Sequence, residues 1–232
     1  MPFQNFLSWK LCLGKSSCMG RKRKGFKRKS GFRDARLFVI ATEGQRTESK
    51  YFSDLNAEEY FPNNNVKVEI IPSENGLSAP RHVLGRLDDF KKKYRIKEDD
   101  ELWMVVDRDF KSWTVKELSE SRQLCSQKGY SLALSNPCFE LWLLLHVIDV
   151  NALSAKEKEK LRRNKRSGKR THCEYVLRDK LGEYNKSHPD FSTILPHVHQ
   201  AIKHADALTQ FGKVDLFESL GTNMQDLVKK LL

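Results

Sequence analysis

One decapeptide joins an apolar strand to two acids: Glu101-Leu-Trp-Met-Val-Val-Asp-Arg-Asp-Phe110. Its unbroken apolar run, Leu102 to Val106, is typical of a strand buried on both faces of a parallel sheet. Because alternate side chains of an extended chain share a face, Asp107 and Asp109 should project together beyond the strand, with Arg108 on the other side. Open α/β sheets bind ligands at that edge, and paired carboxylates suit Mg²⁺ or Mn²⁺. A helix N-cap or a solvated loop is the alternative use of such acids.

A second apolar strand, predicted over residues 36–42, leads to a third acid. Glu43 follows it directly, so this carboxylate should lie at the same edge of the sheet. Gly44 permits a sharp turn into a helix predicted over residues 47–56, with Thr47 as its cap.

The rest of the first 150 residues alternates between strands and helices. Two further strands are predicted, over residues 66–71 and 130–135, and two amphipathic helices, over residues 77–95 and 113–128. The β-α-β-α-β-α-β order predicts an α/β fold with a compact parallel sheet flanked by helices. Three domain segments are expected: a basic, disordered extension over 1–34, the α/β core over 35–150, and a basic linker with helices over 151–232. Within the last, helical patterns cover 175–181, 196–208 and 224–232, with a turn at 221–222.

A buried helix is predicted after the fourth strand, from Ser135-Asn-Pro-Cys-Phe-Glu-Leu-Trp-Leu-Leu-Leu-His146. Asn136 suits the N-cap and Pro137 the first helical position. The segment is apolar nearly all round, so it should be buried. Glu140 is an exception, and its position predicts a place beside the two aspartates. Its alternative role is to pair with a buried basic residue. His146 is interpreted as a core residue.

The net charge of +12 is concentrated in two segments. Residues 21–36 hold nine Lys or Arg and one Asp, and residues 156–170 hold nine Lys or Arg and two Glu. Such segments bind phosphate backbones without reading sequence, although a solubilising tail is the alternative for 21–36. The five cysteines show no zinc-type spacing and fit reduced thiols in the cytoplasm. No run of transmembrane length and no signal peptide is found.

Three motifs together resemble the RloB-like family: Glu43-Gly-x-x-Thr-Glu48, Asp107-Arg-Asp109 and the Asn-Pro-Cys-Phe-Glu-Leu-Trp string. That family is similar to Toprim domains, the metal-dependent fold of topoisomerases, primases and OLD-type nucleases. The resemblance implies Glu43 as general acid/base and Glu43, Asp107 and Asp109 around a divalent metal. It also implies a role in defence against phage beside an ATPase of the AAA or ABC type.

We therefore expect a metal-dependent endonuclease that cleaves RNA, such as tRNA, or DNA, with Glu43, Asp107, Asp109 and Glu140 as catalytic residues. The alternative is a non-catalytic subunit that binds nucleic acid or docks on the ATPase. Glu48 is either a further ligand or a first-turn helix acid, and Lys186 and Tyr184 either contact phosphate or lie in a solvated loop. A homo-oligomer is compatible with the sequence, and no membrane is expected as a partner. The predicted nucleic-acid contacts are Arg46, Arg108, Lys111, Arg162, Arg163, Lys165, Arg166, Lys169 and Arg170.

Overall fold

The computed structural model describes residues 23–26, 35–57, 60–73, 79–109, 113–210 and 212–232. Most of the extension predicted to be disordered, 1–34, lies outside these residues. Within it, the two-residue strand β1 (Lys24–Gly25) pairs in parallel with β4 (Tyr94–Arg95), so this short piece is ordered against the domain.

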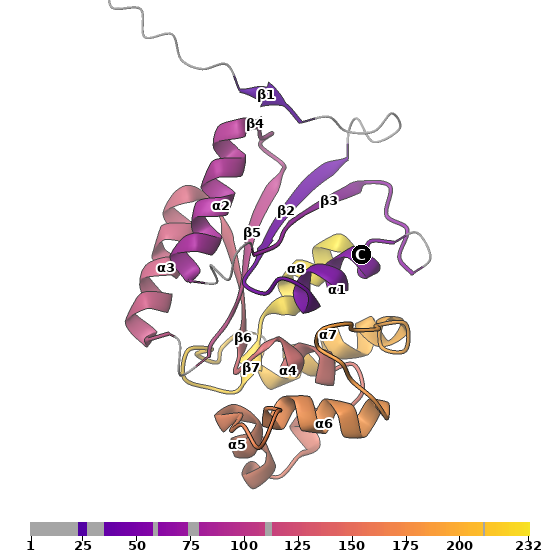
Figure 1. The fold of residues 1–232 in the computed structure, drawn as a ribbon. Coiled ribbons are helices and arrows are strands. Elements are labelled where there is room, and N and C mark those ends of the chain that lie inside the picture. The colour runs from indigo at the N-terminus through magenta and orange to yellow at the C-terminus, as the bar shows by residue number, and fades with distance from the viewer. Residues whose placement is uncertain (1–22, 27–34, 58–59, 74–78, 110–112, 211) are drawn as a thin grey trace, which may run out of the picture.

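The central sheet has five strands in the order β3-β2-β5-β6-β7 (Figure 1). Four are parallel and only β7 is antiparallel to its neighbour. The predicted apolar strand, β5, lies in the middle. The sheet and its flanking helices confirm the α/β fold class. The strands are β2 (Arg36–Thr42), β3 (Val66–Ile71), β5 (Glu101–Asp107), β6 (Ser131–Asn136) and β7 (Gly221–Thr222).

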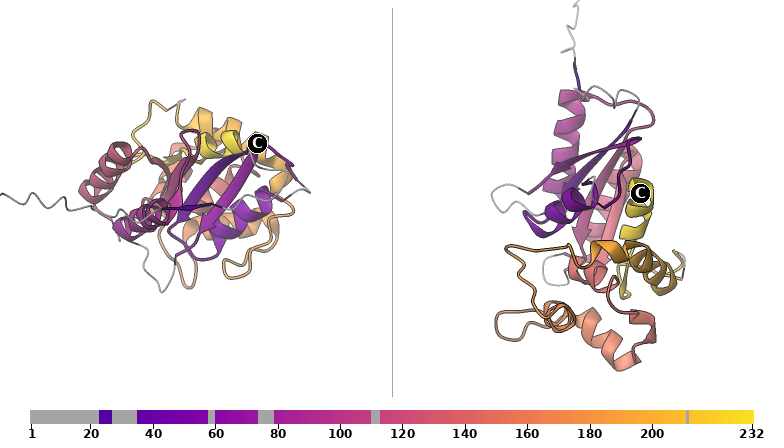
Figure 2. Two further views of the ribbon diagram at one scale, coloured as in Figure 1. Left: turned by 90° about the horizontal axis from the view of Figure 1, so that it is seen from above. Right: turned by 90° about the vertical axis from the view of Figure 1, so that its right-hand side faces the viewer.

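Helices cover both faces of the sheet (Figure 2). Alternate residues of β2 enter opposite layers: Leu37 and Val39 pack with α2 and α3, whereas Phe38 and Ile40 pack with α1, α4, α7 and α8. All four side chains are fully buried, as the apolar runs predict. The helices are α1 (Thr47–Leu55), α2 (Pro80–Lys93), α3 (Val115–Lys128), α4 (Phe139–Leu144), α7 (Val198–Leu208) and α8 (Met224–Leu231).

The order of the strands creates a switch point between β2 and β5. From β2 the chain moves outward to β3, and from β5 it moves the opposite way to β6. Crevices at the carboxyl ends of such neighbouring strands are where open α/β sheets bind ligands. Glu43 and Asp107 lie at these two strand ends.

In Figure 1 most helices of the C-terminal part lie below the sheet, whereas α8 lies beside its strands. Buried residues of α7 and α8 belong to the same core cluster as those of α1 and α4. No helix in the described segments has the length and apolarity that a membrane span requires. The remaining elements are η1 (Val150–Ala152), α5 (Ala155–Arg163), α6 (His172–Leu181) and η2 (Leu195–His197).

Two local predictions at the β6–β7 end of the sheet were wrong. Asn136 is not an N-cap, because it is the last residue of β6, pairs with Gly221, and donates from Nδ2 to the Leu216 carbonyl at 2.8 Å. The Asn136–Pro137 peptide is cis, and the helix begins two residues later at Phe139. The turn expected at 221–222 is instead the strand β7, since it continues the sheet beside β6.

Candidate active site

Two strand ends meet at the switch point. The backbone N–H of Glu43 donates to the Val105 carbonyl at 3.0 Å, which extends the pairing of β2 with β5 by one residue. A second hydrogen bond joins the two strand ends: the backbone N–H of Asp107 donates to Glu43 Oε2 at 3.0 Å. The ladder therefore fixes Glu43 against the end of β5.

The first turn of α1 brings Glu48 into the same cluster. Glu48 is buried, and Gly44 allows its close approach, because a Cβ at Gly44 would overlap the Glu48 carboxylate. Thr47 was predicted to cap this helix, but it is the first helical residue and Arg46 precedes it without a side-chain cap. The Thr47 hydroxyl donates instead to the Lys186 carbonyl at 3.3 Å, which holds a distant loop against α1.

Burial and mutual repulsion raise the pKa of these acids. The pKa of Glu43 is about 7, mainly because of burial, with the charges of Glu48 and Asp109 adding to it and the Asp107 N–H opposing it. Burial also raises the pKa of Asp107, and the charges of Glu43, Glu48 and Glu140 raise it further. Acids that affect one another in this way lie close together, and their negative charge favours a cation.

Lys186 supplies one positive charge to the cluster. Its Nζ lies 2.8 Å from Glu140 Oε1 and 3.7 Å from Glu174 Oε1, although 54% of its side chain is exposed. The Tyr184 hydroxyl donates to Glu140 Oε1 at 3.3 Å. Burial alone would raise the pKa of Glu140, but the charge and hydrogen bond of Lys186, with the Cys138 thiol and the Glu140 N–H, hold it below its usual value. Glu140 therefore stays charged, and it also raises the pKa of Glu48.

The sequence left open what Glu140, Glu48, Lys186 and Tyr184 do. The structure brings all four to one place, and Tyr184 is buried, so it is not part of a solvated loop. Their assembly depends on the loop before Pro189 folding back over α1 and α4. No periodic pattern in that loop marks this contact. Only the unusual position of Glu140 in an apolar helix signals that a basic partner is needed.

The second aspartate of the Asp-x-Asp pair lies farther out. Asp109 is exposed, while Asp107 is mostly covered. The charge of Asp109 nevertheless contributes to the raised pKa of Glu43, so it is near this carboxylate. The indole N–H of Trp113, which sequence analysis did not single out, is near enough to lower the pKa of Glu43, although it makes no hydrogen bond within the described residues.

Arg108, between the two aspartates, has a structural position. It is buried, and its Nε and Nη1 donate to the carbonyls of Phe217 at 2.8 Å and Trp113 at 2.7 Å. The prediction that it points away from the acids fits this arrangement. The prediction that it contacts nucleic acid does not, because its guanidinium is enclosed by the loop before β7.

The other predicted nucleic-acid contacts are distributed around the molecule. Arg46 is exposed, and its Nη1 donates to the Ser187 carbonyl at 3.1 Å, beside the acids. Arg162 and Arg163 follow on α5 and pair with Glu159 at 2.7 and 2.6 Å. Lys111 lies outside the described residues. The remaining four flank a tight turn closed by the Ser167 N–H and the Arg170 carbonyl at 2.9 Å; they are Lys165, Arg166, Lys169 and Arg170.

A divalent cation fits the chemistry of the acidic cluster, although its ligands are not preassembled. Among the residues that the structure describes, no group of three or more His, Cys, Asp or Glu side chains is already arranged to hold a metal ion. The available donors are carboxylate oxygens, which Mg²⁺ and Mn²⁺ prefer. Burial and the neighbouring carboxylates raise the pKa of Glu43 and Asp107, so a cation here would stabilise their charged forms. These are the residues that would hold the ion.

The fold and the site together define an α/β protein with a carboxylate cluster at the switch point of a mostly parallel sheet. The family model described as RloB-like protein matches residues 38–231, and the chain belongs to that family. The resemblance drawn from the three motifs is thereby confirmed. No curated protein and no solved structure matches the chain.

Proposed function

We propose that this protein is a divalent-metal-dependent endonuclease of the Toprim type. One observation carries the proposal: Glu43 and Asp107 meet at the switch point, with Glu48 and Glu140 beside them. Phosphodiester cleavage needs a cation to neutralise phosphate charge and a group to move a proton. This cluster offers carboxylates for both purposes.

Each residue has a proposed role. Glu43, Asp107 and Asp109 would hold Mg²⁺ or Mn²⁺, which would neutralise charge on the phosphate. A pKa of about 7 suits Glu43 to proton transfer near neutral pH. Lys186 keeps Glu140 ionised and leaves a half-exposed ammonium group at the rim of the cluster, where a phosphate oxygen can reach it.

The substrate is proposed to be RNA, with tRNA included, or DNA. Binding to a phosphate backbone is supported by the four Lys and Arg side chains around the turn at residues 165–170. Arg46, beside the acids, supports it as well. Membership of the RloB-like family supports a cytoplasmic effector of phage defence, controlled by a partner ATPase of the AAA or ABC type.

The test is cleavage by the purified full chain, alone and with its partner ATPase. Total RNA and plasmid DNA are incubated with Mg²⁺, with Mn²⁺ or with EDTA. We expect products only with a divalent ion, and none from Asp107→Asn. Asp179→Asn is the matched control, since Asp179 is an exposed acid on α6 paired with Lys180 at 3.4 Å. Cleavage by Asp107→Asn, or in excess EDTA, would overturn the proposal.

A second candidate is a non-catalytic subunit that binds nucleic acid or docks on the ATPase. The ion pair of Lys186 with Glu140 favours it, because an ammonium group already neutralises part of the cluster. If the full chain binds nucleic acid but cleaves none with its partner ATPase present, this function replaces the nuclease.

A further inference from the structure

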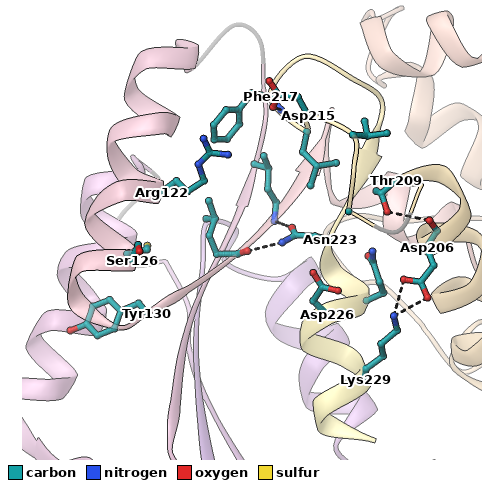
Figure 3. Close-up of a pocket in the computed structure, with 17 residues that line it drawn as sticks. Arg122, Ser126, Tyr130, Asp206, Thr209, Asp215, Phe217, Asn223, Asp226 and Lys229 are labelled. Carbon is teal, nitrogen blue, oxygen red and sulfur yellow. Dashed lines mark hydrogen bonds and ion pairs between the residues drawn. The ribbon is translucent and has the colours of Figure 1, made fainter.

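A cleft of about 620 Å³ lies along the outer edge of β6, and none of the four clustered acids lines it. Figure 3 shows α3 on one side of the cleft and α8 on the other, with the strand between them. The loop before β7 closes one end. Because the floor is the edge of a sheet, the cleft has the shape of a missing strand position.

The edge of β6 is only partly paired. Strand β7 covers Ser135 and Asn136 alone. Next along β6, the side chain of Asn223 makes hydrogen bonds of the kind that a neighbouring strand would make. Its Oδ1 accepts from the Leu134 N–H at 2.6 Å, and its Nδ2 donates to the Leu132 carbonyl at 2.8 Å (Figure 3). The N–H and C=O of one strand residue point to the same edge. The Leu132 N–H therefore points into the cleft, and no described residue accepts a hydrogen bond from it.

A second polar group awaits a partner there. Gln225 lines the cleft and is 3% exposed, and its Oε1 accepts no hydrogen bond from any residue that the structure describes. A buried acceptor left without a donor is unfavourable. A ligand with an N–H group would satisfy Gln225, just as a ligand carbonyl would satisfy Leu132.

The charges that line the cleft favour a basic ligand. Lys229 pairs with Asp206 at 2.7 Å, and the Arg122 guanidinium lies over the Phe217 ring at 4.5 Å from its centre. Asp226 also lines the cleft, and the lining holds three aspartates in all against these two basic side chains. A Lys or Arg of the ligand would balance the negative charge that remains in this lining.

A second copy of this chain does not fit the cleft. Paired strands lie about 4.8 Å apart. The β6 edge lies between α3 and α8 (Figure 3), so a second copy would have to bring its own α3 and α8 to the same place as its β6 edge. The occupant must be a single extended segment.

We propose that the cleft binds an extended, basic peptide segment of a partner protein, which adds a strand to the edge of β6. A backbone hydrogen bond from the Leu132 N–H and one to Gln225 Oε1 give affinity, and a Lys or Arg opposite Asp226 gives specificity. This binding needs neither the acidic cluster nor a metal, so it stands or fails separately from the nuclease.

The test uses a phage-displayed library of random decapeptides, selected on the immobilised full chain. We expect enriched sequences in which apolar residues alternate with others and at least one Lys or Arg is present. A fluorescent copy of the most enriched peptide is then titrated by anisotropy. Its binding should slow hydrogen exchange at Leu132.

Two variants locate the binding site. Ser126→Trp fills the cleft from α3 and should weaken peptide binding at least tenfold, whereas the matched control Gln123→Trp, on the same helix outside the lining, should not. Asp226→Lys should weaken it at least tenfold, and Asp179→Lys should leave it unchanged. Circular dichroism checks that each variant is folded. Failure to enrich any peptide, or equal binding by wild type and Ser126→Trp, would overturn the proposal.

Discussion

The backbone N–H of Asp107 donates a 3.0 Å hydrogen bond to Glu43 Oε2, so the ends of two neighbouring strands are joined through an acid. A glutamine at position 43 can accept the same bond without a charge. The hydrogen bond that joins the two strand ends therefore needs only an oxygen at position 43. The proposed metal binding and proton transfer need a carboxylate there.

The first prediction concerns Glu43→Gln. The pKa of Glu43 in the folded chain, about 7, lies above its ordinary 4.5, so the metal-free protein loses stability as pH rises from about 4.5 through about 7. At pH 8 in EDTA the variant should be more stable by about 1–3 kcal/mol, and nuclease activity should be lost. Urea unfolding measures the gain. Excess Mg²⁺ should stabilise the wild type and not the variant; a variant less stable than wild type in EDTA would contradict the idea.

Much of this edge of the sheet could be predicted from sequence, because it follows from backbone geometry. Apolar runs identify β2 and β5, and an acid placed directly after a buried strand has only the carboxyl edge of the sheet to occupy. The wrong details are those decided by tertiary contacts. Asn136 has the ordinary chemistry of an N-cap, but it is the last residue of β6 and pairs with Gly221 of β7.

The position of Lys186 could not be predicted from the sequence, for a different reason. It is separated from Glu140 by 45 intervening residues of chain, and its loop has no period that would place it. The sequence shows that Glu140 needs compensation but does not show which base supplies it.

The second prediction tests that pair. Lys186→Ala leaves Glu140 buried with its charge uncompensated, which should cost about 1–3 kcal/mol of stability, less than for a fully buried pair because Lys186 is half-exposed. The double variant Glu140→Gln/Lys186→Ala should regain most of that loss. Thermal and urea unfolding measure both. Lys180→Ala is the control, since Lys180 pairs with an exposed aspartate. A double variant no more stable than Lys186→Ala would show that the loss of stability does not come from the uncompensated charge of Glu140.

The third prediction concerns pH and His146, which is buried against Tyr51. Its Nδ1–H donates to the Trp142 carbonyl at 3.0 Å, and its Nε2 accepts from the Tyr51 hydroxyl at 3.0 Å. Burial lowers the pKa of His146 to about 4 from the ordinary 6.5. The unfolded chain therefore binds more protons between these values, and His146 removes up to about 3 kcal/mol of stability as pH falls from 6.5 to 4.

Glu43 acts in the opposite direction over part of this range, so the His146 effect is measured as a difference. The free energy of unfolding of wild type minus that of His146→Gln should fall steadily from pH 6.5 to pH 4. Glutamine can donate and accept in place of the two ring nitrogens, which keeps the comparison close. A difference that stays constant with pH would mean that His146 is charged in the folded protein.

The last prediction concerns the basic turn at residues 165–170. Lys165, Arg166 and Lys169 are exposed, and Arg170 is partly so, whereas Arg162 and Arg163 are already paired with Glu159. Replacing the first four by Gln should therefore weaken nucleic-acid binding more than replacing the two paired arginines. Each lost phosphate contact lowers the slope of log K against log salt by about 0.9 for duplex DNA and about 0.7 for single strands.

Anisotropy with labelled single-stranded and duplex oligonucleotides, from about 50 to about 200 mM salt in EDTA, measures these slopes without cleavage. The fourfold variant should lose a slope of about 2–4 with an unchanged melting temperature, because the turn is held by backbone hydrogen bonds. The preference between oligonucleotide sequences should stay the same, since backbone contacts carry no sequence information. An unchanged slope would assign the turn to solubility or to contact with a protein, and Arg46 beside the acids would then be the next basic residue to replace.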